Sequence, residues 1–200
     1  EQQVTQALMQ EKTQAELDLL KAQVQPHFIF NTLNNIYSLS LNKDPRTSDL
    51  IYRLSSFLDY KLYDSNTNFT TLEKEVEFLK NYLELQKLRF EDNFDVSFNV
   101  YSKMEGYRIS PLLLLPLVEN CFKHSLSDDS QKSWIRIDLS TKEGMITIKL
   151  ENSLPGTNDI SQRILPKPHS GMGLEIVNRK LEILYQERHE LICRRESNSY

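Results

Sequence analysis

The chain has 200 residues, of which 39% are hydrophobic and 26% are charged, with a formal net charge of −4. This length suits one large domain or two small ones, and the acidic balance argues against nucleic-acid binding, which usually needs a basic domain. Only 5 glycines are present, well below the roughly 7% of average proteins, which favours long helices over a turn-rich all-β fold.

No apolar run approaches the roughly 20 residues that a membrane-spanning helix needs, and the first residues do not follow the pattern of a secretory signal. The two cysteines, Cys121 and Cys193, lack the spacing of metal ligands. We therefore expect both to be reduced core residues of a cytosolic protein.

Residues 1–66 predict a helical hairpin. The first 25 residues contain no Gly or Pro and carry a narrow apolar stripe, typical of a helix that packs against a partner helix and continues upstream. Pro26 should kink this helix without ending it, because helix-favouring residues continue to Leu41. After a turn at 42–45, a second helix presents one apolar face: Leu50, Leu54, Phe57, Leu58 and Leu62. Its thin core favours a four-helix bundle formed by dimerisation.

Residues 67–200 predict a second domain, of class α+β, after a polar linker at 65–68. Thr70 and Glu73 have the spacing of a capping box, and the helix that follows has one apolar face: Leu72, Val76, Leu79, Leu83 and Phe90. Apolar residues then alternate around 96–100, 135–139 and 146–150, which predicts strands.

Further helices are expected beside these strands. An apolar helix over 111–125 separates the first two strands, and a turn at 141–144 joins the last two. A helix with Leu174 and Val177 on one face follows, and 190–195 has the pattern of another strand. Together they predict a mixed sheet with helices covering one face.

His27 is the first candidate for chemistry. Asn31 lies one helical turn further along on the same face, so its amide can hydrogen-bond one imidazole nitrogen and leave the other as a nucleophile. A neutral imidazole is a competent phosphoryl acceptor, although an isolated histidine in a helix is more commonly a surface or interface residue. Phe28 and Phe30 should anchor the helix on either side, and Pro26 loosens it beside the histidine.

A second group is Glu119, Asn120, Lys123 and His124. Spacings of four place these polar residues on one side of an otherwise apolar helix. Burying them without partners would be costly, so they predict either local salt bridges or a ligand site.

Two glycine-containing segments complete the candidates. Asn152 and Gly156 follow a strand, where a plain turn is the commoner outcome. Gly171 and Gly173 directly precede the last helix, whose first backbone amides could bind an anion, although a lone Gly-x-Gly is more often a turn. Residues 157–169, with two prolines and no apolar periodicity, are expected to form a mobile lid.

The sequence Gln25-Pro26-His27-Phe28-Ile29-Phe30-Asn31 closely resembles the phosphoacceptor box of the LytS/YehU-type sensor histidine kinases. The likeness extends through 54–58, 72–76 and 82–90 and covers nearly the whole chain. It implies that His27 is the autophosphorylation site, and that a dimerising hairpin precedes an ATP-binding α/β sandwich of the GHKL type. It also implies ATP and Mg²⁺ as ligands.

The likeness assigns roles to the other candidates as well. The segment around residue 119 resembles the N-box: Asn120 would coordinate Mg²⁺, Glu119 would support the metal or its water, and Lys123 and His124 would lie near the phosphates. Asn152, with Gly156, stands in a first glycine box, where the family has an aspartate that binds the adenine amino group; Leu154 replaces a glycine there. Gly171, Gly173 and Leu174 resemble the second glycine box.

The implied function is an ATP-dependent histidine kinase that passes its phosphoryl group to a response-regulator aspartate. It would be a homodimeric cytoplasmic domain of an inner-membrane protein, reaching the membrane only through an upstream segment absent from this chain. A catalytically degenerate dimeric scaffold is the alternative, favoured by Asn152, by Leu154 and by Asp59, where the family commonly has arginine. A repair or chaperone ATPase of the GHKL group would share the nucleotide boxes but leaves the Pro-His-Phe motif unexplained.

Overall fold

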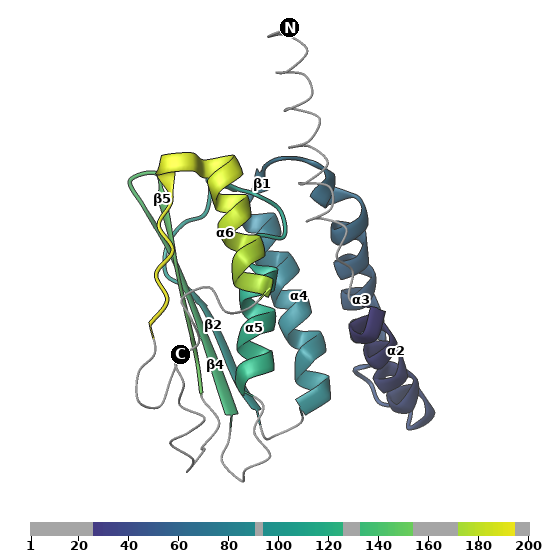
Figure 1. The fold of residues 1–200 in the computed structure, drawn as a ribbon. Helices are drawn as coiled ribbons and strands as arrows, with labels where there is room; N and C mark the ends of the chain where they lie inside the picture. The colour runs from purple at the N-terminus through teal and green to yellow at the C-terminus, as the bar shows by residue number, and fades with distance from the viewer. Residues whose placement is uncertain (1–25, 91–93, 126–132, 154–171, 195–200) are drawn as a thin grey trace, which may run out of the picture.

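The computed structural model describes residues 26–90, 94–125, 133–153 and 172–194. It is an α+β fold, as predicted, with two helices beside a unit in which helices cover one face of a sheet (Figure 1). The helices are α2 (Pro26–Leu41), α3 (Thr47–Leu62), α4 (Leu72–Phe90), α5 (Leu115–Ser125) and α6 (Met172–Tyr185), with 3₁₀ turns η1 (Asp64–Asn66) and η4 (Gln186–Arg188). The strands are β1 (Thr70–Thr71), β2 (Phe94–Val100), β3 (Arg108–Ile109), β4 (Ser133–Lys142) and β5 (Met145–Asn152).

The main sheet has the order β2-β4-β5. β2 and β4 are parallel, so the chain must cross over between them, and it does so through α5 on the covered face. β4 and β5 form an antiparallel hairpin in which Glu143 and Gly144 both have positive φ, the requirement of a tight hairpin turn. The inward side chains of β4 are buried as the alternation predicted: Ile135, Ile137 and Leu139. β1 and β3 form a separate antiparallel pair.

A run of aromatic rings joins the helical hairpin to α4. The ring of Phe28 on α2 lies 5.2 Å from that of Phe57 on α3 and 5.1 Å from that of Tyr82 on α4. Phe57 in turn stacks on Phe78 at 5.0 Å. The described core is therefore continuous across residue 66, and the predicted division into 1–66 and 67–200 stays a prediction.

Several local predictions are wrong. The apolar helix begins at Leu115 rather than 111, because residues 111–114 form a turn in which Leu112 has a φ of 55°. The residue that caps α4 is Thr71 and not Thr70, since the Lys74 amide donates to Thr71 Oγ1 at 3.4 Å. Phe28 is buried and anchors α2, whereas Phe30 is 65% exposed.

Two predictions near the C-terminal end are also wrong. Residues 190–194 form no strand: Leu191 is only partly buried and Ile192 is 58% exposed, so little of the apolar surface of the segment is packed. Both cysteines are free, as expected, but only Cys121 is buried and Cys193 is exposed. The predicted helix at 1–25 and the predicted lid at 157–169 lie outside the described residues. No helix of the described ranges combines the length and apolar character needed to cross a bilayer.

Candidate functional site

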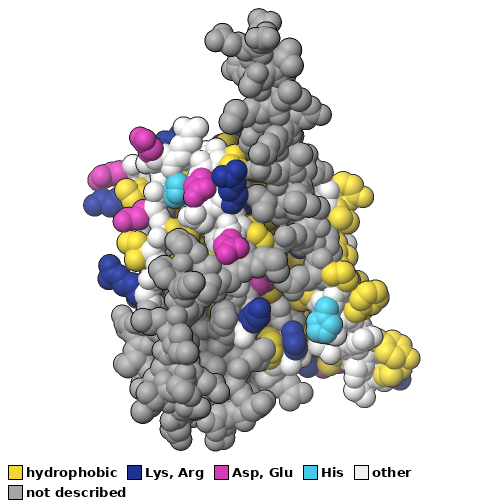
Figure 2. Space-filling model, in the orientation of Figure 1, with side chains coloured by type: hydrophobic (Ala, Val, Ile, Leu, Met, Phe, Trp, Pro, Cys, Tyr) yellow, Lys and Arg dark blue, Asp and Glu magenta, His cyan; other side chains and the backbone are white. Residues whose placement is uncertain are grey.

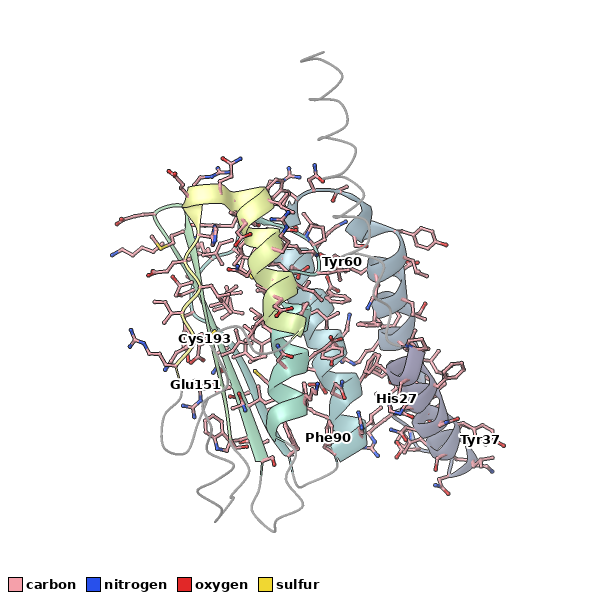
Figure 3. The ribbon with its side chains drawn as sticks, viewed as in Figure 1. His27, Tyr37, Tyr60, Phe90, Glu151 and Cys193 are labelled. Carbon is pink, nitrogen blue, oxygen red and sulfur yellow. The ribbon has the colours of Figure 1, made fainter. Side chains whose placement is uncertain are left out.

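His27 lies in the first turn of α2 with its side chain exposed (Figure 3). The predicted contact with Asn31 is present: Asn31 Nδ2 lies 3.2 Å from His27 Nδ1 and 3.2 Å from His27 Nε2. An amide N–H donates only to an unprotonated ring nitrogen. Asn31 can therefore serve whichever nitrogen lacks a proton, and the neighbouring Phe28, buried among aromatic rings, holds this turn in place.

Asn120 of α5 and Gly173 of α6 are brought into contact. A Cβ atom added to Gly173 would lie 2.6 Å from Asn120 Nδ2 and 2.9 Å from Asn120 Oδ1, so only glycine leaves room for this amide. Asn120 Nδ2 is buried and has no hydrogen-bond partner in the described part of the chain. An unpartnered buried amide is costly, which marks this contact as a place for a polar ligand.

Glu119 precedes Asn120 on α5 and is partly buried. Burial raises the pKa of Glu119 to about 7, and the positive charge of Lys61 on α3 opposes that rise. Burial likewise lowers the pKa of Lys61. The cation that acts on Glu119 thus comes from the helical hairpin, whereas Lys123, the predicted neighbour one turn along α5, is exposed.

Asn152 ends β5 with 1% of its surface exposed. Its Nδ2 donates to the Ser153 carbonyl oxygen at 2.9 Å, which fixes the direction of the amide. Asn152 Oδ1 is left buried without a partner among the described residues. The side chain therefore keeps a hydrogen-bond acceptor without a partner among the described residues, and its contact with an adenine amino group stays a prediction.

The structure describes only some of the remaining predicted site residues. Leu174 is buried in the first turn of α6, so only its backbone can face a ligand; backbone amides in a first helical turn lack intrahelical partners. Gly156, Gly171 and the His124 side chain lie outside the described residues.

The nucleotide and Mg²⁺ stay predictions, and the residues present include groups of the chemistry that both would need. Asn120 has an unpartnered amide nitrogen, a donor that suits a phosphate oxygen, and its Oδ1 is an amide oxygen; Glu119 supplies a carboxyl group, and Asn152 Oδ1 is an acceptor without a partner among the described residues. Amide and carboxylate oxygens are ligands that Mg²⁺ accepts. Within the described ranges, no group of three or more His, Cys, Asp or Glu side chains is placed to hold a metal ion.

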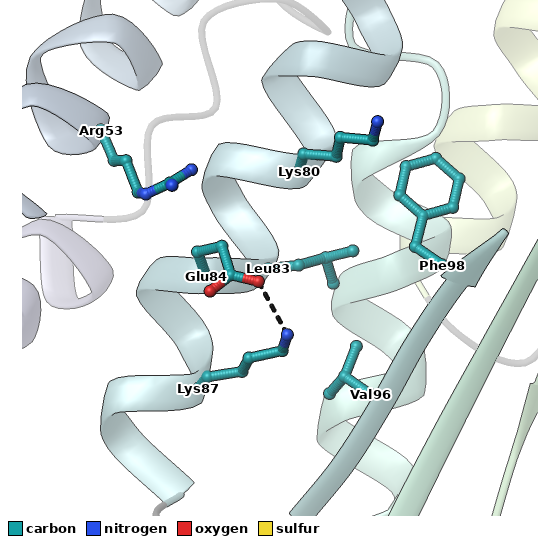
Figure 4. Close-up of a pocket in the computed structure, with 7 residues that line it drawn as sticks. All are labelled: Arg53, Lys80, Leu83, Glu84, Lys87, Val96 and Phe98. Atoms are coloured by element: carbon teal, nitrogen blue, oxygen red, sulfur yellow. Dashed lines mark hydrogen bonds and ion pairs between the residues drawn. The ribbon is translucent and has the colours of Figure 1, made fainter. Parts of the chain in front are cut away.

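A hollow of about 290 Å³ lies elsewhere, between α3, α4 and β2 (Figure 4). An ion pair along α4 forms part of its wall, with Lys87 Nζ 2.7 Å from Glu84 Oε1. Its lining contains none of the predicted site residues: Arg53, Lys80, Leu83, Glu84, Lys87, Val96 and Phe98.

Three charged residues are buried although no pattern predicted a role for them: Lys61, Glu75 and Lys180. Each occupies a position of an apolar helical stripe. Glu75 stands between Leu72 and Leu79 at spacings of three and four, where an apolar residue is expected. A charge at such a position is the signal that could have found them, since buried charges need partners.

A family model described as histidine kinase matches residues 15–94. Sensor protein LytS of Staphylococcus epidermidis is 30% identical over 142 residues, which cover 71% of this chain and 24% of that protein. Sensor histidine kinase BtsS of Escherichia coli is 27% identical over 188 residues, 94% of this chain and 32% of that protein. LytS of Staphylococcus saprophyticus is 30% identical over 177 residues, with coverages of 86% and 30%. The chain thus spans between 24% and 32% of the length of these curated relatives.

Proposed function

Because the predicted resemblance to the LytS-type sensor histidine kinases is confirmed, we propose that this chain is the kinase core of a two-component sensor. It would autophosphorylate His27 and pass the phosphoryl group to an aspartate of a response regulator. One observation carries the nucleotide site: two buried amides, Asn120 on α5 and Asn152 at the end of β5, each keep an atom without a partner.

In this proposal each residue has one task. Asn152 Oδ1 accepts a hydrogen bond from the adenine amino group, and the Asn120 amide, with Glu119 beside it, lies at the phosphate end. Mg²⁺, when bound, would neutralise phosphate charge. The backbone amides in the first turn of α6, among them that of Leu174, add a partial positive charge that attracts the phosphates.

His27 supplies the nucleophile. One ring nitrogen forms a bond to the γ-phosphorus as the bond from that phosphorus to the ADP oxygen breaks, and the proton on the other ring nitrogen is then lost to solvent. The Asn31 amide, whose Nδ2 lies 3.2 Å from both ring nitrogens, orients the imidazole before the reaction. Because this N–H donates to the unprotonated nitrogen, which is also the nucleophile, the hydrogen bond must break as that nitrogen attacks. Positioning of this kind accounts for most catalysis of phosphoryl transfer.

We also propose that the hairpin forms the homodimer. Large apolar side chains are exposed along it, and Figure 2 shows hydrophobic surface over the edge where α2 and α3 lie. They are Phe30, Leu33, Tyr37, Leu41, Ile51, Tyr52 and Leu62. Exposed apolar area of this extent on two adjacent helices suits a partner pair of helices. On the same resemblance, the domain would be the cytoplasmic part of a membrane-bound sensor.

The test is incubation with γ-labelled ATP and Mg²⁺. We expect acid-labile, alkali-stable label on the wild type, none on His27→Gln, and none on Asn120→Ala. His189→Gln is the matched histidine control and Asn99→Ala the matched amide control, because the Asn99 side chain bonds Asp138 at 2.8 Å, away from the site. Both controls should retain label.

The degenerate scaffold predicts a different result. Asn152 offers an uncharged acceptor in place of a carboxylate, and Asp59 is exposed on α3. Absence of label at millimolar ATP, from protein shown to be dimeric, would exclude the kinase and leave the scaffold. Calorimetry with Mg-ATP then decides whether that scaffold still binds nucleotide.

A further inference from the structure

Residues 110–114, which join β3 to α5, are buried throughout. A buried loop must satisfy its backbone polar groups, and side chains from α4 and α6 do so here. The Ser110 amide donates to the Tyr185 hydroxyl at 2.7 Å, and Lys180 Nζ donates to the Pro111 carbonyl oxygen at 3.2 Å. This segment is therefore held by specific bonds and not by apolar packing alone.

Glu75 of α4 makes the central contacts. Its Oε2 accepts from the Leu112 amide at 3.0 Å and its Oε1 from the Leu114 amide at 3.4 Å. Leu112 has a φ of 55°, a left-handed conformation that disfavours leucine. The carboxylate thus stabilises a backbone shape that the residue would not adopt by itself.

The same carboxylate also reaches the phosphoacceptor hairpin. The hydroxyl of Tyr60, on α3, donates to Glu75 Oε2 at 2.6 Å (Figure 3 labels Tyr60). Glu75 is 0% exposed, and its three donors suit an ionised carboxylate, which only accepts. Burial raises the pKa of Glu75, while these donors and the nearby charge of Lys180 oppose the rise.

The held segment leads directly into the nucleotide site. α5 begins at Leu115, one residue after Leu114, and Asn120 follows within roughly 7.5 Å of helix axis. The Asn120 amide touches Gly173, which lies on α6 two turns before Lys180. A shift of residues 110–114 would move the start of α5, and with it the Asn120 amide, relative to Gly173.

We propose that Glu75 is a positioning residue of the nucleotide site. It holds residues 110–114 in the shape that sets the Asn120 amide against Gly173, and Tyr60 completes its bonding, so that hairpin and nucleotide site share one buried centre. The role of Asn120 in this inference rests on the proposed function.

The experiment uses the whole chain labelled with ¹⁵N. We compare wild type with Tyr60→Phe and Glu75→Gln, and use Tyr101→Phe as the matched control, because Tyr101 also bonds a carboxylate, Asp138 at 3.1 Å, but in the sheet. Without nucleotide, we record hydrogen exchange of the Leu112 and Leu114 amides and the side-chain amide signal of Asn120. Calorimetry then measures the affinity for Mg-ADP.

We expect Glu75→Gln to speed exchange of both amides and to weaken Mg-ADP about tenfold, the effect of losing one hydrogen bond to a charged group. Tyr60→Phe should move the same signals less, and Tyr101→Phe should move none. The Asn120 signal must shift in both test variants. A role confined to stability would lower the melting temperature without that shift.

An unmoved Asn120 signal in Tyr60→Phe, with unchanged exchange at Leu112, overturns the proposal even if Glu75→Gln fails to fold. Failure of the proposed function is separately visible, because wild type would then bind no Mg-ADP while the nucleotide-free signals still report on Glu75.

Discussion

The substitution Gly173→Ala should weaken nucleotide binding while leaving the free energy of unfolding nearly unchanged. The added Cβ would lie 2.6 Å from Asn120 Nδ2, 2.9 Å from Oδ1 and 3.0 Å from Cγ, whereas non-bonded contacts settle near 3.5–4.0 Å, so the amide must move by about 1 Å. The amide is the end of a side chain, so it can turn aside. Alanine also favours a helix over glycine by up to about 1 kcal/mol. We therefore expect the free energy of unfolding to stay within about 1 kcal/mol of wild type.

Binding should respond quite differently. Displacement of a positioning group by about 1 Å can cost on the order of 100-fold in rate. We expect Mg-ATP affinity to fall at least about tenfold, or ~1.4 kcal/mol, in calorimetry, and phosphorylation of His27 to fall further. Urea unfolding monitors stability in the same samples.

Gly106→Ala is the reciprocal control. Gly106 has a φ of +82° with nothing within 4 Å of an added Cβ, so alanine there is strained without touching the site. It should lose about 1 kcal/mol of stability and keep its affinity for nucleotide. Unchanged Mg-ATP affinity in a stable Gly173→Ala protein would refute the assignment of the Asn120–Gly173 contact to the nucleotide site.

Three further outcomes are expected. In protein diluted to the monomer, Phe28→Ala should lower the free energy of unfolding by about 3–5 kcal/mol in urea titrations, whereas Phe30→Ala, exposed in the single chain, should stay within about 0.5 kcal/mol; equal effects would contradict the packing of α2 on α4. A thiol reagent should modify Cys193 at once in the native protein and Cys121 only after unfolding, because burial raises the pKa of Cys121 to about 12; two fast thiols would disprove its burial. Tyr37→Glu should shift sedimentation toward monomer if the hairpin is the dimer interface, and an intact dimer would argue for another surface.

Local patterns predicted most of the elements correctly. Alternation of apolar residues located β4 and β5 because one face of β4 is buried and the same face of β5 is partly buried, and the glycine of their turn adopts the positive φ expected of such a hairpin. The spacing of four between His27 and Asn31 predicted their contact because a helix brings such residues together. These properties depend on neighbours within a few residues.

Local sequence patterns did not predict where α5 begins or which phenylalanine of α2 is buried. Pro111 is well suited to begin a helix, yet α5 starts at Leu115, because Glu75 binds the amides of Leu112 and Leu114 and holds a turn before it. The sequence also predicted that Phe30 anchors α2, but Phe30 is exposed and it is Phe28 that contacts α4. In each case the deciding partner lies on a distant element.

The sequence by itself determined the periodicity of the elements and the residue types that can carry phosphoryl chemistry, His27 and Asn120 among them. Only the tertiary structure decided which buried polar groups meet. The Glu75–Leu112 bond joins residues 37 apart in the chain, and no short-range pattern encodes such a pair. The physical reason is the high free-energy cost of leaving buried polar groups unpaired. Where packing supplies partners, as at Glu75, the hydrogen bonds stabilise the fold. Where buried atoms have no partner among the described residues, as in Asn120 and Asn152, a ligand is expected.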